Sequence, residues 1–221
     1  MSVLITGANR GIGRALAQAY VALGEAVIGT TRHDIPAELK DAVDWQILDV
    51  TDDGSFKALA ARLDGRPIST VICNAGIFLE KHLSMDDFAP DLWAKTFATN
   101  VTGPFLTMHC LLPNLQGAKE PKIAVVASDY ASSTLAQGGG LIYRSSKAAV
   151  VNLVANMALD LAPIGVAVGA YHPGWVQTDM GGAEATVSPA QSASGLIAGI
   201  DALNVDTSGC YESFDGTALP Y

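Results

Sequence analysis

The sequence predicts an α/β fold in which helices flank a central seven-stranded parallel sheet. Three observations support this prediction: short β-prone apolar runs alternate with longer helix-forming segments, the alternation continues along the chain, and no internal repeat or low-complexity tail interrupts it. This alternation is typical of a doubly wound sheet, which binds its ligands at the carboxyl ends of its strands. We therefore expect residues 1–221 to form one domain.

The expected strands are the apolar runs, and the expected helices fill the intervals between them. The strands are predicted at residues 2–6, 26–31, 44–48, 69–73, 122–127, 166–171 and 209–214. The helices are predicted at residues 12–23, 52–63, 85–98, 101–113, 144–161 and 188–203. Gly7, Asn74, Ser128 and Pro173 each follow one of these strands, so all four are expected at the ligand-binding edge.

Composition narrows the function without specifying it. The chain has 221 residues, of which 49% are hydrophobic and 16% charged, and this suits one domain with a large core. A net charge of −9 argues against binding to nucleic acid or anionic membranes. The apolar stretch 150–171 contains Asn152, Asp160 and Pro163, so no membrane span is expected. The cysteines and histidines are scattered, which predicts reduced thiols, a cytoplasmic location and no metal site.

The first predicted strand leads into a glycine-rich turn and then a helix, the context that a dinucleotide fingerprint requires. The glycines permit a tight turn, and the helix start offers N–H groups and a positive dipole end to a phosphate. The spacing is G-x-x-x-G-x-G, and a tight turn without a ligand is the alternative. The candidate phosphate-binding residues are Gly7, Asn9, Arg10, Gly11, Ile12 and Gly13.

The end of the second predicted strand, Thr31-Arg32, indicates which dinucleotide is bound. An acidic residue here usually contacts a free 2′-hydroxyl group, whereas an arginine suits a 2′-phosphate. No acidic residue stands at positions 30–32, and Arg10 adds a second positive charge in the turn, so the sequence favours NADP over NAD. Asp34, two residues further on, leaves NAD as an alternative cofactor. Arg32 could also be an ordinary surface charge.

Tyr143 and Lys147 are predicted to lie on one helix face, because residues at i and i+4 are neighbours on a helix. A nearby ammonium group favours the phenolate, so we expect the pKa of Tyr143 to fall below its usual value of about 10. Tyr143 is thus a candidate general acid. Taken alone, a Tyr-x-x-x-Lys spacing usually marks only an ordinary pair on a helix surface, and it gains its weight here from the other motifs.

Together with these motifs, the chain resembles the short-chain dehydrogenase/reductase family along its whole length. The other matching segments are Asp49-Val50, Asn74-Ala75-Gly76, Asn100-Val101-Thr102-Gly103, Ser128, and Pro173-Gly174 followed by Thr178. The segments 172–182 and 215–220 resemble the branch of C-factor and sniffer-type carbonyl reductases. The resemblance implies a Rossmann-type fold and an oxidoreductase that interconverts a carbonyl and an alcohol with NADP(H), or alternatively NAD(H).

The resemblance also implies a role for each matching residue. Tyr143 would exchange a proton with the substrate, Lys147 would bind the nicotinamide ribose, and Ser128 would hydrogen-bond the carbonyl oxygen. Asn100 would hold a water that links Lys147 to solvent. The remaining cofactor contacts would come from Asp49, Val50, Asn74, Ala75, Gly76, Pro173, Gly174, Val176 and Thr178.

The spacing of the active serine departs from the family pattern. The family usually has this serine thirteen residues before the tyrosine, which here is Tyr130. We favour Ser128 because it follows the apolar strand directly, and the extra residues can be accommodated in the loop at 138–140. Ser132 and Ser133 are the alternatives.

The substrate is the least determined feature. An apolar pocket could be lined by Phe78, Tyr130, Ile142, Trp175 and Met180, although ordinary packing would explain each of them. A small ketone or aldehyde is expected. A 3-oxoacyl-[acyl-carrier-protein] reductase and a non-catalytic dinucleotide-binding signalling protein are the alternatives. Relatives often pair through helices equivalent to 101–113 and 144–161, which predicts a homodimer or homotetramer.

Overall fold

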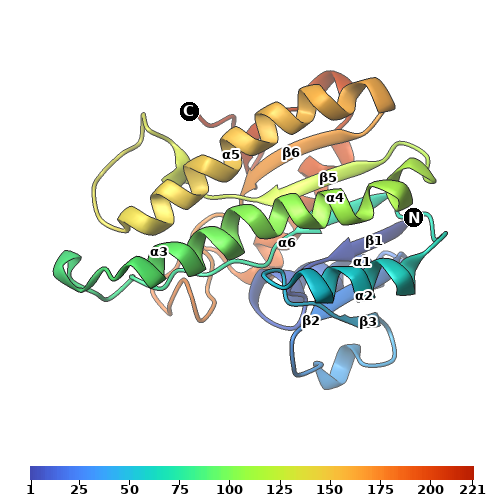
Figure 1. Cartoon of the computed structure of the whole chain (residues 1–221), viewed down its shortest axis with the longest axis horizontal. Coiled ribbons are helices and arrows are strands. Elements are labelled where there is room, and N and C mark those ends of the chain that lie inside the picture. Colours follow the sequence, from blue (N-terminus) through green and yellow to red (C-terminus); the bar gives the residue numbers. More distant parts are fainter.

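A computed structural model describes all residues from Met1 to Tyr221 and contains one seven-stranded parallel sheet (Figure 1). The strand order across the sheet is β3-β2-β1-β4-β5-β6-β7, so the winding direction reverses between β1 and β4. The strands are β1 (Ser2–Ile5), β2 (Ala26–Thr31), β3 (Asp44–Ile47), β4 (Thr70–Cys73), β5 (Lys122–Val126), β6 (Ala167–His172) and β7 (Tyr211–Ser213). The predicted doubly wound α/β fold is thereby confirmed.

The central strands are apolar on both sides because helices cover both faces of the sheet. Val3, Leu4 and Ile5 of β1 are fully buried, and all four residues of β4 are buried. In the β1–β4 pair, Leu4 lies opposite Val71. This alignment brings the ends of the two strands, and the loops that follow them, to the same edge of the sheet.

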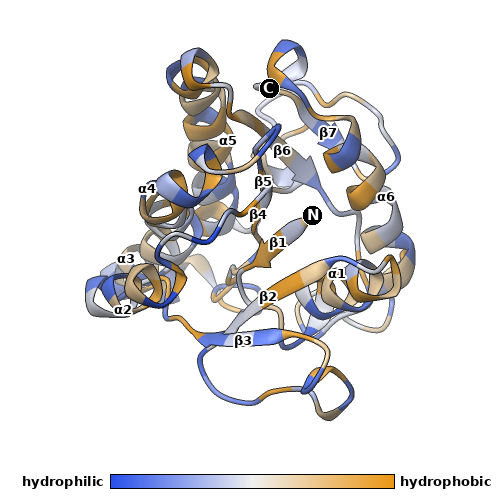
Figure 2. Cartoon of the chain, turned by 90° about the vertical axis from the view of Figure 1, so that its right-hand side faces the viewer, coloured by the Kyte–Doolittle hydropathy of each residue, from blue (hydrophilic) through white to orange (hydrophobic).

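The helices form one layer on each side of the sheet (Figure 2). Helices α1 (Gly11–Ala22) and α6 (Pro189–Ala202) cover one face. The other face is covered by α2 (Asp53–Leu63), α4 (Gly103–Gln116) and α5 (Leu141–Leu161). A buried cluster lies under each layer, of 18 residues beneath α1 and α6 and 26 beneath the other three helices. At about 1.5–3 kcal/mol for each large apolar side chain, burial in these clusters is the main force that holds the layers on the sheet.

Two predicted helix starts are wrong. The helix predicted to start at residue 85 is α3 (Pro90–Phe97), preceded by a single 3₁₀ turn at Met85–Asp87. Ala89 is extended because a residue before proline avoids the helical region, and proline is well suited to the first helical position. A π-helical turn at Ala98–Thr102 then joins α3 to α4. Helix α5 begins at Leu141 instead of 144, directly after Gly140 in the left-handed conformation.

The segment Leu141–Ile164 is long and apolar enough to cross a membrane by length and composition alone. One face of α5 nevertheless belongs to the core, where Val150, Val154 and Leu161 are buried. A helix of the core can be this apolar because one of its faces packs on the sheet. The buried valines therefore account for much of the apolar character of this segment.

Candidate active site

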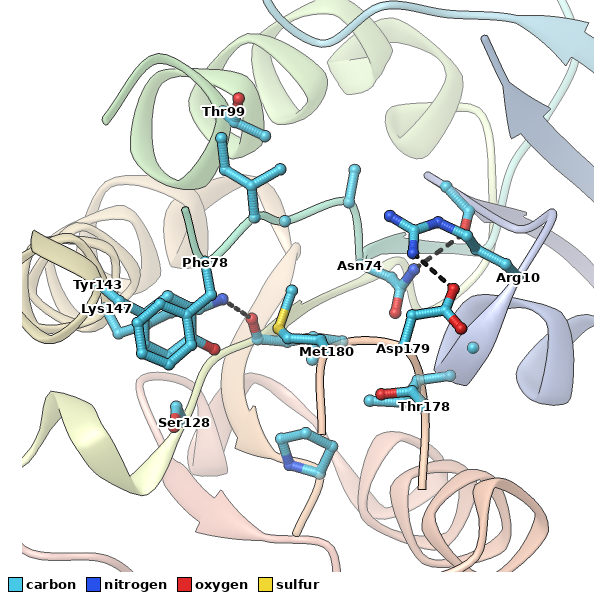
Figure 3. Close-up of a pocket in the computed structure, with 18 of the residues that line it drawn as sticks. Arg10, Asn74, Phe78, Thr99, Ser128, Tyr143, Lys147, Thr178, Asp179 and Met180 are labelled. Atoms are coloured by element: carbon cyan, nitrogen blue, oxygen red, sulfur yellow. Dashed lines mark hydrogen bonds and ion pairs between the residues drawn. The ribbon is translucent and has the colours of Figure 1, made fainter. Parts of the chain in front are cut away.

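A cavity of about 1080 Å³ lies at the carboxyl ends of the strands, and its lining includes residues that follow β1, β2, β4, β5 and β6. The loops after β1 and β4 flank the point where the strand order reverses, which is where doubly wound sheets bind their ligands. This volume slightly exceeds the usual range of ligand pockets, about 300–1000 Å³. Figure 3 shows side chains from both halves of the sheet directed into this cavity.

The glycine-rich turn forms one wall of the cavity, and its glycines are required by geometry. Gly7 and Gly11 have φ angles of +65° and +55°, a region that side chains disfavour. A Cβ atom on Gly13 would overlap the carbonyl oxygen of Gly7 and lie 2.5 Å from the amide nitrogen of Asn74. No side chain caps the start of α1, so its first-turn N–H groups remain available to a phosphate.

Asn74 and Thr6 join this turn to β4. The Asn74 side-chain amide donates hydrogen bonds to the carbonyl oxygens of Thr6 (2.9 Å) and Gly7 (3.1 Å). The Thr6 hydroxyl oxygen accepts from the backbone N–H groups of Asn74 (3.0 Å) and Ala75 (3.1 Å). Asn74 lines the cavity as predicted, and it also fixes the shape of the turn.

Arg32, Asp49 and Val50 line the cavity at the ends of β2 and β3. The Arg32 side chain is 60% exposed, and its guanidinium lies 3.9 Å from the carboxylate of Asp49. Burial acts to raise the pKa of Asp49, but hydrogen bonds from Thr51 and the charge of Arg32 lower it below its ordinary value. Arg32 therefore places an exposed cation beside an ionised carboxylate in this part of the cavity.

Ser128, Tyr143 and Lys147 meet at the other end of the cavity (Figure 3). Ser128 stands two residues after the end of β5, and the other two residues stand one turn apart on α5. The Lys147 ammonium lies 5.6 Å from the centre of the Tyr143 ring and donates a 2.7 Å hydrogen bond to the Val126 carbonyl. The ring of Phe78 stacks on that of Tyr143, with the ring centres 4.4 Å apart.

The expected lowering of the Tyr143 pKa is not found. Burial raises the pKa of this phenol, the Ser128 hydroxyl opposes the rise, and the charge of Asp129 adds to it. Burial also lowers the pKa of Lys147, to about 8, because the charged ammonium is taken out of water. At neutral pH the phenol is thus protonated, which is the state a proton donor needs.

Asn100 lies in the π-helical turn before α4 and is almost fully buried. Its side-chain oxygen accepts from the Ile77 N–H (2.9 Å), and its amide group donates to the Ile77 carbonyl (2.9 Å) and the Ser146 hydroxyl (3.0 Å). Both amide protons of Asn100 are used in hydrogen bonds within the protein. The NH₂ group therefore does not bind the water that the family resemblance implies between Lys147 and solvent. The side chain instead anchors the segment after Gly76.

Most of the predicted site residues line the cavity, including the four apolar candidates for a substrate pocket, Phe78, Tyr130, Trp175 and Met180. Asn100 and Gly13 lie just outside its lining and support it. Ile142 is fully buried and does not line the cavity, so its assignment to the substrate pocket is wrong. Ser132 and Ser133 are also absent from the lining.

The structure adds charged residues that the sequence did not single out. The Nδ1 atom of His172 lies 3.6 Å from Asp129, and burial lowers the pKa of this histidine while Asp129 opposes that shift. Asp179 pairs with Arg10 across the cavity mouth at 3.0 Å (Figure 3). The position of Asp129 just after a predicted strand could have marked it as a site residue. The Arg10–Asp179 pair has no such local cue, because the two residues are 169 positions apart.

Comparison with known proteins agrees with this architecture. The family described as short chain dehydrogenase matches residues 1–187. The C-signal of Myxococcus xanthus is 37% identical over 168 residues, which cover 75% of this chain and 100% of that protein. A 1-hydroxy-2-glutathionyl-2-methyl-3-butene dehydrogenase from Rhodococcus sp. (strain AD45) is 35% identical over 231 residues, covering 100% of this chain and 99% of the relative.

Solved structures give the same result. The NADPH-bound carbonyl reductase from chicken fatty liver superposes with a TM-score of 0.92 at 30% identity, covering 100% of this chain and 98% of that one. Carbonyl reductase Sniffer of D. melanogaster superposes with a TM-score of 0.93 at 27% identity, covering 100% of this chain and 99% of that one. With the family match extending over most of the chain, these likenesses show that the protein belongs to the short-chain dehydrogenase/reductase family and is an NAD(P)-dependent oxidoreductase.

Proposed function

We propose that this protein is an NADP-dependent reductase of ketones or aldehydes, which also catalyses the reverse oxidation of the alcohol. One observation carries the proposal: Ser128, Tyr143 and Lys147 meet at one end of the cavity, and Arg32 stands at the other. The glycine-rich turn lies on the wall of the same cavity. A dinucleotide and a small carbonyl compound would therefore fit the site together.

The residues present suit a nicotinamide dinucleotide. The uncapped start of α1 and the positive-φ glycines would hold the pyrophosphate, and the segment from Pro173 to Thr178 would hold the nicotinamide end. Arg32, with no acidic residue at positions 30–32, favours a 2′-phosphate. Two structural neighbours are described as NADPH-bound and with bound NADP, which supports the same preference. When bound, the reduced cofactor supplies the hydride.

The residues of the chain would handle the proton and the developing negative charge. The buried, protonated Tyr143 would donate its hydroxyl proton to the carbonyl oxygen as hydride reaches the carbon. The Ser128 hydroxyl donates a 3.1 Å hydrogen bond to Asp129 in this structure. It would rotate to donate to the carbonyl oxygen instead and so stabilise the charge that develops there. Lys147 would bring a cation close to the phenolate that forms. In alcohol oxidation these proton transfers run in reverse.

The substrate end combines apolar walls with one carboxylate. Phe78, Tyr130, Trp175 and Met180 offer apolar surface, and Asp129 places a negative charge beside Ser128. A neutral carbonyl compound with an apolar body suits this surface, and an anionic group next to the carbonyl does not. A 3-oxoacyl thioester is a second candidate, because a 3-oxoacyl-[acyl-carrier-protein] reductase from Vibrio cholerae is 29% identical over 184 residues.

The proposal is tested by titrating the purified protein with NADPH and with NADH, followed by turnover measurements. Nicotinamide absorbance is followed at saturating cofactor with aldehydes, neutral ketones and 3-oxoacyl thioesters. We expect tighter binding of NADPH and turnover of the neutral ketones or aldehydes. Turnover of the thioesters alone would establish the second candidate. Tight binding with no turnover in any class would contradict both reductases and favour a signalling role.

A further inference from the structure

Helix α5, which carries Tyr143, begins without a local cap. The residue before it, Gly140, has no side chain and a φ of +56°, and the first turn of the helix contains no acidic residue. The first N–H groups of a helix have no partner within the helix, and a buried helix start therefore needs one from elsewhere. Ile142 and Tyr143, in this first turn, are buried. The partner must accordingly come from another part of the fold.

Glu80 supplies this partner from the loop after β4. Its side chain is almost fully buried, and one carboxylate oxygen accepts a 2.6 Å hydrogen bond from the backbone N–H of Tyr143. The two residues are 63 positions apart in the sequence. The other carboxylate oxygen, Oε2, is buried and has no protein partner. A carboxylate is the side chain best suited to this place, because it accepts a charge-assisted bond and faces the positive end of the helix dipole.

The segment that carries Glu80 contacts the tyrosine a second time. Two residues earlier, the Phe78 ring stacks on the Tyr143 ring at a centre-to-centre distance of 4.4 Å and an angle of 15° between the planes. One residue before that, Ile77 is held by the two hydrogen bonds to Asn100. The segment 77–80 is therefore anchored at one end and grips both the ring and the backbone of Tyr143.

We propose that Glu80 is a positioning residue for the reaction: by capping α5 at Tyr143 it fixes the phenol against Ser128 and the substrate. This proposal rests on the proposed function, in which Tyr143 is the proton donor. It assigns no contact between Glu80 and the substrate, since Glu80 does not line the cavity. A displacement of about 1 Å at a reacting group can cost about 100-fold in rate, so a cap at this position can control catalysis.

Glu80 also acts on the phenol through its charge. The groups that face Tyr143 are the Ser128 hydroxyl, the carboxylates of Asp129 and Glu80, the phenol of Tyr130 and, across the ring, the Lys147 ammonium. Both carboxylates raise the pKa of Tyr143. Removing the charge of Glu80 should therefore shift the oxidation rate profile to lower pH, because alcohol oxidation needs the phenolate.

The test compares Glu80→Gln, Glu80→Ala and a control, Ser188→Ala, in the full-length protein. Glutamine keeps an oxygen that can accept from the Tyr143 N–H but lacks the charge, and alanine removes both. Ser188 caps α6 with its own side chain and does not line the cavity, so its loss weakens a helix cap away from Tyr143. The measurements are amide hydrogen exchange over 141–147, kcat and KM with NADPH and the fastest ketone or aldehyde of the panel, and the pH profile for the matching alcohol.

We expect Glu80→Ala to speed exchange over 141–147 and to lower kcat about 100-fold with little change in the KM for NADPH. Glu80→Gln should restore most of kcat while its oxidation profile moves to lower pH. Ser188→Ala should lower only the melting temperature. Unchanged amide exchange over 141–147 in Glu80→Ala would show that Glu80 does not cap α5, and this outcome does not depend on which substrate is used. If that variant does not fold, Glu80→Met, which keeps the length of the side chain and removes the acceptor, takes its place. Wild-type exchange over 141–147 and wild-type kcat in Glu80→Met overturn the proposal.

The result separates this inference from the proposed function. Tyr143→Phe, measured in parallel, tests the proton donor itself. If Tyr143→Phe abolishes turnover while both Glu80 variants match wild type in kcat and pH profile, the inference fails and the proposed function stands. If Tyr143→Phe turns over normally, the assignment of Tyr143 as the proton donor fails. If wild type turns over no carbonyl compound, the proposed function fails. In both cases the exchange measurement alone decides whether Glu80 caps α5.

Discussion

Three hydrogen bonds fix the position of Ser128 in the cavity. Its hydroxyl group donates to Asp129 (3.1 Å) and accepts from the Tyr130 N–H (3.2 Å). Its carbonyl oxygen accepts a 2.6 Å bond from the buried phenol of Tyr211 on β7. Strands β5 and β7 together therefore set where this side chain stands.

Replacing Ser128 tests its role in stabilising the carbonyl oxygen. We expect Ser128→Ala to lower kcat by about 10²–10³, the usual cost of losing one oxyanion donor. Steady-state kinetics with NADPH and the best carbonyl substrate measure this loss, and Ser133→Ala is a matched control because Ser133 does not line the cavity. A near-normal rate in Ser128→Ala would show that another group has this role.

Arg32 is expected to decide between the two dinucleotides. Arg32→Asp should weaken NADPH binding by roughly tenfold or more, about 1.4 kcal/mol, because a carboxylate would face the 2′-phosphate. NADH binding should change much less. Fluorescence titration of both cofactors measures the two affinities, with Arg66→Gln as a control, because Arg66 pairs with Asp44 and does not line the cavity. Equal losses for the two cofactors would refute the assignment.

For single residues, the sequence predicts which side chains line the cavity better than it predicts their pKa values and long-range contacts. Tyr143, Lys147 and the glycines stand in local patterns, and these patterns taken together identify them. The direction of the Tyr143 pKa was wrong because it depends on burial by Phe78 and on the charges of Asp129 and Glu80, which come from other loops. Glu80 itself has no local signal, since its partner is 63 residues away.

At the scale of elements, the segment after β6 is tied across the mouth of the cavity. Asp179 pairs with Arg10 of the glycine-rich turn, and Lys81 donates a 2.6 Å bond to the Met180 carbonyl. Thr178 lies beside Gly11, since a Cβ atom on that glycine would be 3.4 Å from the threonine methyl group. A phosphate bound at the turn would therefore compete with Asp179 for Arg10.

This competition predicts that Asp179→Asn binds NADPH more tightly than wild type. The pair is exposed, and exposed ion pairs contribute about 0.2–1 kcal/mol, so the gain in affinity should be roughly 1.4- to fivefold. The gain should shrink as salt is added, because screening weakens exposed charges. Titration at two salt concentrations measures both effects. Weaker NADPH binding in Asp179→Asn would mean that the carboxylate supports the cofactor site.

The elements themselves were largely predictable. Every strand was placed to within about two residues, because a parallel sheet covered on both faces needs apolar runs that are easy to recognise. Helix α3 starts later than predicted because Pro90 keeps Ala89 extended, so the turn at Met85–Asp87 cannot continue into the helix. Helix α5 starts earlier than predicted, and no local pattern indicates this start because the cap comes from Glu80 in another loop.

At the scale of the whole molecule, burial of Lys147 couples global stability to pH. The pKa of Lys147 is about 8 in the folded protein and about 10.5 when unfolded, so the unfolded chain binds more protons between these values. Stability should therefore rise as pH increases through this window, and Lys147→Met should lack that rise. From pH 8 to pH 9.5 wild type should gain about 1.5 kcal/mol relative to the variant.

Urea unfolding of both proteins at the two pH values measures this difference. The variant corrects for every other group that titrates in the same range, because only residue 147 differs. A constant difference in unfolding free energy between wild type and Lys147→Met would show that the ammonium keeps its ordinary pKa despite its burial.

The most direct test of the account is to compare wild type with Tyr143→Phe in NADPH binding and in turnover of the best carbonyl substrate. We predict that wild type turns over and that the variant binds NADPH within about twofold of wild type, since only the phenolic hydroxyl is lost. Turnover by the variant should fall to background, because no other group donates the proton. Turnover near the wild-type rate in Tyr143→Phe would contradict the assignment of Tyr143 as the proton donor.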